Sequence, residues 1–422
     1  MRLYIPPTLP AKESQLIGDI LLAQADAQAE RELVFAPIKQ APKQAVWFSY
    51  INNPDGSIRW FWPKKQRFPA HLGLYNSATW KAKLYRAVTQ CLFPLGLSGQ
   101  LAAGQFAVEG LQIPLQEALN SVPNDGYGVF TGTHGKNRKT IVAISHKRTI
   151  THFLKLAHTK RGKALLEQER NSLLQLRPLQ VNGLVLPEVQ TSEQSHALIL
   201  SNIRPPRAAT PSQLTAAHIQ AMWGWYQPTH QLIRLGDWPG YQQIGQVIQE
   251  LALQQALDPS LDPTQVDLLL QYLREGFHSL DPDSVVPMAM AHGDFTPWNQ
   301  YHSAEAIHLY DWELSQPSAP MLYDAFHFVY QSGILLLQAT ETELAAHLST
   351  ALELPAMQAL IQRYQLPIEP LHLLYLLQVT SYYLPIYFAA PQVHLQVHWL
   401  LRHWTHALEH CLSSHPTLTP TH

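Results

Sequence analysis

Two polar segments, each placed directly after an apolar run, constrain this chain more than any other feature. The segment HGDFTPWN (292–299) follows MAMA, and DWE (311–313) follows IHLY. Short apolar runs are consistent with buried strands, and the loops after strands are where catalytic groups commonly lie. Asp294 and Asp311 are seventeen positions apart, enough for a loop, a strand, a turn and a returning strand. The spacing therefore predicts that both loops meet at one edge of a small sheet.

These segments contain the residue types that phosphoryl transfer from ATP requires. The reaction needs a carboxylate to orient and deprotonate the acceptor hydroxyl, and oxygen ligands to hold Mg²⁺ on the phosphates. Kinases have a catalytic Asp, an Asn five positions later and then a second Asp after a nearby strand. The same three residues occur here in the same order. We therefore expect Asp294 to be the base, and Asn299 and Asp311 to bind Mg²⁺. The alternative is a pair of Asx-type turns, in which the aspartates only accept backbone hydrogen bonds.

HGDFTPWN followed by LYDWE resembles the catalytic loop and metal-binding segment of the aminoglycoside phosphotransferase and choline kinase family, whose members are related to the protein kinases. The resemblance implies ATP and Mg²⁺ as cofactors and a small hydroxyl-bearing molecule as the acceptor. It also implies that His292 braces the catalytic loop, and that Asp324 in MLYDAF braces the C-terminal lobe. The resemblance covers about residues 125–335.

A kinase also needs a lysine on a strand of the small lobe, held by a glutamate from the next helix. Lys155 lies within the apolar strand FLKL, where an unpaired charge is costly. Glu167 and Glu169 both follow in a helical pattern, and Glu169 shares its helix face with the leucines four and seven positions later. We therefore expect Lys155 to pair with Glu169. The alternative is an edge-strand lysine with its amine in water.

The loop GTHGKNRK (132–139) lies between two predicted strands, where its backbone could cover phosphates. It matches neither a Walker motif nor the glycine-rich loop of protein kinases, so an ordinary hairpin turn is an equal alternative. Gly132 and Gly135 are the candidate phosphate-covering residues. By resemblance, the backbone of Ser201 and Ile203 in HALILSNI is expected to meet adenine.

Together these patterns predict an α+β, two-lobed protein-kinase-like fold. We expect a small lobe with an antiparallel sheet at 121–203 and a mostly helical large lobe, which carries the catalytic loop, at 204–422. Residues 1–120 are expected to form an N-terminal extension of unknown role with helices, one of them over 19–35, and a hairpin. The turn sequence NPDG (53–56) between two aromatic-rich strands predicts that hairpin.

Composition excludes several classes of protein. The chain is 46% hydrophobic and 14% charged, which excludes a disordered chain, and its formal charge of −2 offers no basic field for nucleic acid. Its two cysteines cannot form a disulfide framework, so we expect a cytoplasmic protein. The apolar stretch 371–390 contains His, Gln and Pro and is expected to be a buried helix, not a membrane span. No pattern indicates an oligomeric state.

Two rival functions stay open. Asp294, Asp311 and Glu313 could form a carboxylate pair for glycoside hydrolysis, although Lys155 and Asn299 would then have no task. A kinase-fold nucleotide-binding or regulatory protein without turnover is the second rival. For the acceptor, the chain after Glu343 has few carboxylates but many aromatic residues, which favours a sugar or amino alcohol over a polycation. The aromatic residues are equally consistent with an ordinary helix core.

Overall fold

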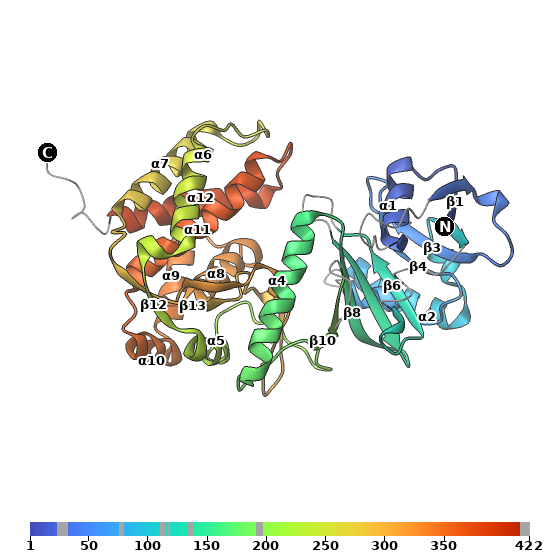
Figure 1. Ribbon diagram of the computed structural model, residues 1–422, viewed down its shortest axis with the longest axis horizontal. Coiled ribbons are helices and arrows are strands. Elements are labelled where there is room, and N and C mark those ends of the chain that lie inside the picture. Colours follow the sequence, from blue (N-terminus) through green and yellow to red (C-terminus); the bar gives the residue numbers. More distant parts are fainter. Residues whose placement is uncertain are drawn as a thin grey trace. The chain divides into compact units, whose positions relative to one another are not determined.

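The computed structural model describes residues 1–22, 33–75, 80–109, 115, 119–132, 139–190 and 197–413. The chain divides into two compact units. Unit 1 comprises Met1–Leu173 and Pro187–Ile203, and unit 2 comprises Leu174–Leu186 and Arg204–His422. Figure 1 shows unit 1 with most of the strands and unit 2 with most of the helices.

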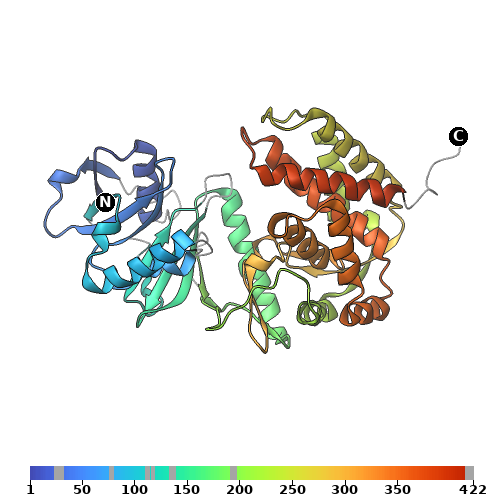
Figure 2. The ribbon, with the colours of Figure 1, turned by 180° about the vertical axis from the view of Figure 1, so that it is seen from behind.

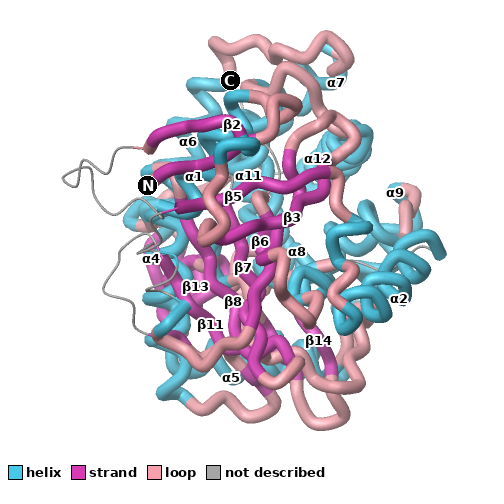
Figure 3. Tube along the Cα trace, turned by 90° about the vertical axis from the view of Figure 1, so that its right-hand side faces the viewer, coloured by secondary structure: helices cyan, strands magenta, loops and turns pink. Residues whose placement is uncertain are grey.

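Unit 1 is built on one sheet, which is antiparallel except for the pair β1–β2. Its strand order is β10-β11-β8-β7-β6-β4-β3-β5-β1-β2, and several of its strands lie side by side in Figure 3. The strands are β1 (Arg2–Ile5), β2 (Val34–Pro37), β3 (Val46–Asn52), β4 (Ile58–Pro63), β5 (Gly104–Glu109), β6 (Gly126–Phe130), β7 (Lys139–His146), β8 (Thr149–Ala157), β10 (Val189–Gln190) and β11 (Ala197–Ser201).

The predicted hairpin is present as β3 and β4. Asp55 closes its turn by accepting the N–H of Ser57 at 2.9 Å, and Gly56 adopts the left-handed φ of +83° that the turn requires. Strand β4 then pairs with β6, so the N-terminal strands continue the same sheet as β6–β8. The prediction of a helix over 19–35 is wrong at its C-terminal end, because Val34 and Phe35 belong to strand β2, which pairs with β1. Residues 23–32 of that expectation lie outside the described residues.

Three helices accompany the sheet among the described residues of unit 1: α1 (Ala11–Leu22), α2 (Trp80–Leu95) and α4 (Lys160–Leu176). Figure 2 shows α2, in light blue, in front of the strands. The core between strands is aromatic: Phe48 stacks on Phe106 with ring centroids 5.0 Å apart, and Phe61 meets Phe106 edge-on at 5.4 Å. Burial of these rings stabilises the sheet.

Unit 2 is mainly helical and contains two small sheets with orders β12-β13-β16 and β14-β15-β9. The strands are β9 (Leu184–Val185), β12 (Gln231–Arg234), β13 (Val285–Ala291), β14 (Gln300–His302), β15 (Ile307–Leu309) and β16 (Gln316–Pro320). The helices are α5 (Ala216–Thr229), α6 (Pro239–Leu251), α7 (Pro263–Ser279), α8 (Tyr323–Gln331), α9 (Glu341–Leu352), α10 (Pro355–Tyr364), α11 (Ile368–Phe388) and α12 (Leu395–Ser413). Helices α6, α7, α11 and α12 pack together (Figure 1).

The predicted α+β class, the antiparallel sheet and the mainly helical C-terminal part are confirmed. The stretch 371–390 forms most of α11, whose leucines are buried against neighbouring helices. Within the described residues, no helix combines the length and apolar character needed to cross a membrane.

Candidate active site

The loop after β13 is fixed by a buried carboxylate from α8. The N–H groups of His292 and Gly293 donate to Asp324 Oδ2 and Oδ1, at 2.7 and 3.0 Å. Burial raises the pKa of Asp324 to about 6, while these two hydrogen bonds act to lower it. Gly293 has a φ of +83°, and a Cβ there would lie 2.0 Å from the carbonyl oxygen of Leu314. Asp324 and Gly293 thus set the direction in which the chain leaves the strand at Asp294.

The ring of His292 links this loop to the residue before Asp311. Its Nδ1 lies 3.2 Å from the N–H nitrogen of Asp294, and its Nε2 lies 3.0 Å from the carbonyl oxygen of Tyr310. A carbonyl only accepts, so Nε2 carries the proton and Nδ1 is the acceptor of a neutral ring. Burial lowers the pKa of His292 to about 4, which keeps the ring in this neutral form.

Asn299 holds the side chain of Asp294. Its Nδ2 donates to Asp294 Oδ2 at 2.8 Å and to the Asp294 carbonyl oxygen at 3.0 Å. Asn299 ends the short 3-10 turn Pro297–Asn299, where its N–H donates to the Thr296 carbonyl at 3.1 Å. Because Nδ2 is committed to Asp294, the oxygen Oδ1 is the Asn299 atom suited to bind a cation.

Strands β14 and β15 place Asp311 beside Asn299. Gln300 pairs with Leu309, and the Tyr310 N–H donates to the Asn299 carbonyl at 3.1 Å. Asp311 follows Tyr310 directly and has a φ of +68°, which is uncommon for a residue other than glycine. The two loops therefore meet at one edge of the small sheet, as predicted. The positive φ of Asp311 turns the chain sharply into Trp312, which is buried.

His327 on α8 also contacts Asp294, and the sequence patterns did not predict this contact. Its Nε2 lies 3.2 Å from Asp294 Oδ1, and the imidazole is fully buried while the Asp294 side chain is 24% exposed. The ring stacks on Tyr323 with centroids 5.8 Å apart and meets Tyr375 edge-on at 6.1 Å. The one available signal was its spacing, because His327 lies one helical turn after Asp324 and so shares its helix face.

In unit 1, Lys155 and Glu169 form a buried ion pair. Lys155 Nζ lies 2.8 and 2.7 Å from Oε1 and Oε2 of Glu169. The side chain of Glu169 is fully buried and that of Lys155 is 10% exposed, whereas Glu167 is exposed. The pair connects β8 to α4. The kinase hypothesis requires this arrangement, in which a glutamate of the next helix orients the lysine that holds the phosphates.

The other candidate nucleotide residues are less defined. Gly132 follows β6 with a φ of +82°, and Gly135 lies outside the described residues. The N–H of Ser201 donates to the Glu188 carbonyl at 2.9 Å, so it is not available to adenine. Ile203 is half-buried at the end of unit 1.

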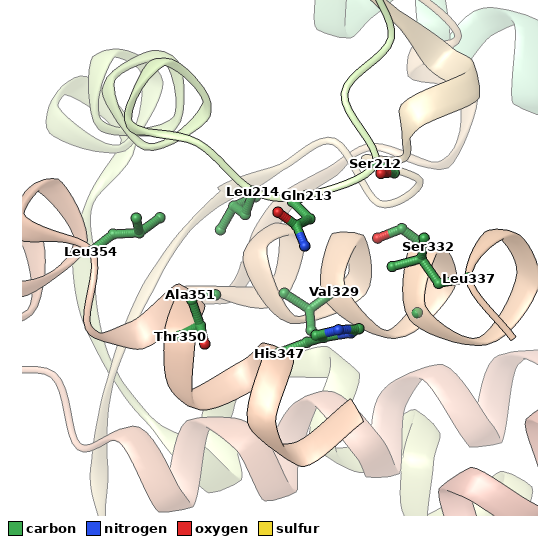
Figure 4. A pocket seen from close by; sticks show the side chains of 11 residues that line it. Ser212, Gln213, Leu214, Val329, Ser332, Leu337, His347, Thr350, Ala351 and Leu354 are labelled. Carbon is green, nitrogen blue, oxygen red and sulfur yellow. The ribbon is translucent and has the colours of Figure 1, made fainter. Parts of the chain in front are cut away.

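A cavity of about 100 Å³ lies in unit 2, apart from the residues described above (Figure 4). The residues around it come from the segment before α5, from α8 and the π-helical turn after it, and from α9 up to Leu354. None of the candidate catalytic residues lines it.

Comparison with known proteins gives similarity only at the level of structure. No protein-family model and no curated protein sequence matches the chain. An ADP-bound aminoglycoside phosphotransferase is 9% identical, with a TM-score of 0.41, covering 72% of this chain and 99% of that one. A choline/ethanolamine kinase family protein from Mesorhizobium loti is 14% identical, with a TM-score of 0.36, covering 73% and 92%. An amicoumacin kinase bound to AMP-PNP and Ca²⁺ is 13% identical, with a TM-score of 0.45, covering 72% and 94%. At these identities and TM-scores the likeness assigns no substrate and no residue role.

Proposed function

We propose that this protein is an ATP-dependent O-phosphotransferase of the aminoglycoside phosphotransferase and choline kinase type. The observation that carries the proposal is the Asp294 carboxylate, which is partly exposed and held on both oxygens by side chains, Asn299 on Oδ2 and His327 on Oδ1. An Asx turn would instead use a backbone N–H. Among the described residues, the Asp294 carboxylate contacts side chains and accepts from no backbone N–H, which favours a role on a substrate over an Asx turn.

In the proposed reaction, Asp294 orients the acceptor hydroxyl and takes its proton as the oxygen attacks the γ-phosphorus of ATP. The bond between that phosphorus and the β,γ-bridging oxygen breaks, and ADP leaves with the electron pair. The contacts to Asn299 and His327 fix the rotation of the carboxylate, so a lone pair stays directed at the hydroxyl before the reaction begins. His292 is neutral and buried and keeps the loop in register. It takes no proton in this scheme.

The oxygen atoms Asn299 Oδ1 and the Asp311 carboxylate are the hard donors that suit Mg²⁺, and would hold it. A bound Mg²⁺ supplies charge neutralisation on the phosphates. Lys155, oriented by Glu169, contributes a positive charge for the phosphates in the same way. Gly132, Ser201 through its carbonyl, and Ile203 remain candidates for further nucleotide contacts, as does Gly135.

The acceptor is proposed to be a sugar or amino alcohol. Burial and the nearby charge of Asp294 both raise the pKa of the Tyr383 hydroxyl. Tyr382, Tyr383 and Tyr387 on α11 are half-buried. Tyr383 and Tyr387 stack on each other and on Trp404, so an acceptor would meet only the parts of these rings that their neighbours leave open. Aromatic faces beside a single base suit stacking on a small ring or alkyl group better than they suit a polycation, which needs several carboxylates.

A screen of acceptors tests the proposal. The purified protein is given Mg·ATP with sugars, choline, ethanolamine or aminoglycosides, and ADP release is followed. We expect magnesium-dependent turnover with one small hydroxyl compound. Selective turnover of an aminoglycoside would contradict the acceptor class and retain the kinase. A lack of turnover with every acceptor, together with retained ATP binding, would favour the nucleotide-binding rival.

A further inference from the structure

Helix α2 has two apolar stripes, and one of them faces solvent. The inner stripe anchors the helix: Thr89 and Phe93 are fully buried, with Phe93 5.6 Å from Trp62 and 5.4 Å from His71 between ring centroids. The hydroxyl oxygen of Tyr85, two turns before Phe93, lies 3.4 Å from Nε2 of His71. These residues recur every four positions and account for the packing of α2 on unit 1.

The second stripe, here called the outer stripe, runs the whole length of the helix. Its members are spaced by four, four, three and four positions and include Trp80, 70% exposed, and Leu95, 67% exposed. The outer stripe consists of Trp80, Leu84, Val88, Cys91 and Leu95. In helical projection it lies opposite the inner stripe, because both follow the same repeat with an offset of about half a turn. A continuous exposed apolar row of this kind marks an interaction surface.

Positive charge flanks the outer stripe. The sixteen residues of α2 include Lys81, Lys83 and Arg86 and contain no Asp or Glu. Lys81 and Lys83 project on opposite sides of the stripe and are both exposed. An occupant that covers the stripe therefore meets one cation on each edge, both in the first turn of the helix.

We propose that α2 docks unit 1 onto an anionic lipid surface, with the outer stripe inserted among the acyl chains and Lys81 and Lys83 at the phosphate level. A helix with a basic polar face, an apolar face and a Trp is the pattern that lies in a bilayer interface. The stripe is a single convex row about 24 Å long, which suits a soft surface. A second copy of this chain is disfavoured because it would bring the same cations together.

The single exposed cysteine gives a direct probe. Cys91 lies in the outer stripe, whereas Cys411 is buried, so an environment-sensitive fluorophore can be attached at Cys91. The labelled full-length protein is mixed with phosphatidylcholine vesicles that contain or lack phosphatidylglycerol. We expect a blue shift and co-sedimentation only with the anionic vesicles, weakened by salt.

Surface variants separate the two components of binding. Leu84→Ser with Val88→Ser is expected to weaken vesicle binding at least about tenfold, because two apolar side chains are lost. Lys81→Gln with Lys83→Gln is expected to weaken it about fivefold per lysine. Leu253→Ser is the matched control, since Leu253 is 90% exposed on unit 2 and should leave binding unchanged. All these positions are exposed, and an unchanged melting temperature checks that each variant folds.

Three outcomes would overturn the proposal. The first is equal or absent binding to both kinds of vesicle, and the second is binding that Leu84→Ser with Val88→Ser does not weaken. The third is a concentration-dependent dimer, seen by light scattering without vesicles, that the same variant abolishes, because the occupant would then be a second copy. Activity is not used as the readout, so the test is independent of the proposed kinase function.

Discussion

At the scale of single residues, the site contains two aspartates with different tasks. Asp324 is buried and accepts two backbone N–H groups, whereas Asp294 is partly exposed and contacts side chains. Both occur in short motifs that the sequence alone made visible, but the difference between them comes from burial. Burial gives Asp324 a structural role, and the partial exposure of Asp294 agrees with the chemical role that we propose for it.

His327 is expected to act as a positioning residue for Asp294. His327→Leu removes the donor to Asp294 Oδ1 and should lower kcat by about 10²-fold while the KM for ATP changes little. His327→Gln can place an N–H at a similar distance from the backbone and should recover most of the activity. Steady-state kinetics of both variants check this.

A purely structural His327 would give a different pattern. In that case Leu and Gln would lower activity equally and in proportion to their loss of thermal stability. A rise in KM with unchanged kcat would place His327 in substrate binding instead.

Residue patterns predicted some partners and missed others for a physical reason. Glu169 was distinguished from Glu167 by helical phase, and the buried contact with Lys155 follows that phase. The contact between His327 and Asp294 joins residues 33 positions apart on a loop and a helix, and no local periodicity encodes it. Local patterns specify which side of an element is buried but not what it meets there.

At the scale of elements, the turn at Gly293 is the most constrained. Gly293→Ala combines a left-handed φ with a Cβ 2.0 Å from the Leu314 carbonyl oxygen, so we expect it to destabilise unit 2 by well over the ~1–2 kcal/mol of left-handed strain alone. Urea unfolding measures the change in free energy.

Gly183→Ala is the matched control for that variant. Gly183 also has a positive φ, +74°, but the nearest atom to its added Cβ is the Glu305 carbonyl oxygen at 4.0 Å. The free energy of unfolding of Gly183→Ala should therefore fall by only about 1–2 kcal/mol. Equal losses at the two glycines would show that the close approach to Leu314 does not constrain the loop.

Strand pairing shows where element-level prediction ends. The β3–β4 hairpin could be predicted because its turn residues are local. The pairing of β4 with β6, through Trp60 and Phe130, joins the N-terminal strands to the rest of the sheet and could not be predicted. An alternating apolar pattern specifies a buried face and leaves the identity of the neighbouring strand open.

At the scale of the whole molecule, buried histidines couple stability to pH. Burial lowers the pKa of His218 to about 3 and those of His292 and His372 to about 4, all in unit 2. The unfolded chain binds these protons near pH 6.5, so stability is lost as pH falls from about 6.5 towards 4. Asp324 acts in the opposite direction, because its pKa is raised to about 6 and its contribution is lost as pH rises.

For these four groups the net result is an uptake of about two protons on unfolding near pH 5, or about 2.5 kcal/mol per pH unit. Burial also lowers the pKa of His302, which adds to the slope in the same direction. We expect urea unfolding of unit 2 to show this slope between pH 5 and 6. His372→Gln should reduce the proton uptake on unfolding by about one proton. His406→Gln, which replaces an exposed histidine, should leave the uptake unchanged. A flat profile would mean that the buried rings are already protonated in the folded protein.

If Asp294 is the base of a phosphoryl transfer, as proposed, its replacement should slow the chemical step itself. The transfer of γ-phosphate from Mg·ATP to the acceptor identified by screening is followed in single turnovers, for the wild-type protein and for Asp294→Asn, which retains the shape of the side chain. We expect the rate to fall by about 10²–10⁴-fold in the variant while ATP binding, measured separately, is unchanged. An undiminished rate in Asp294→Asn would contradict the assignment.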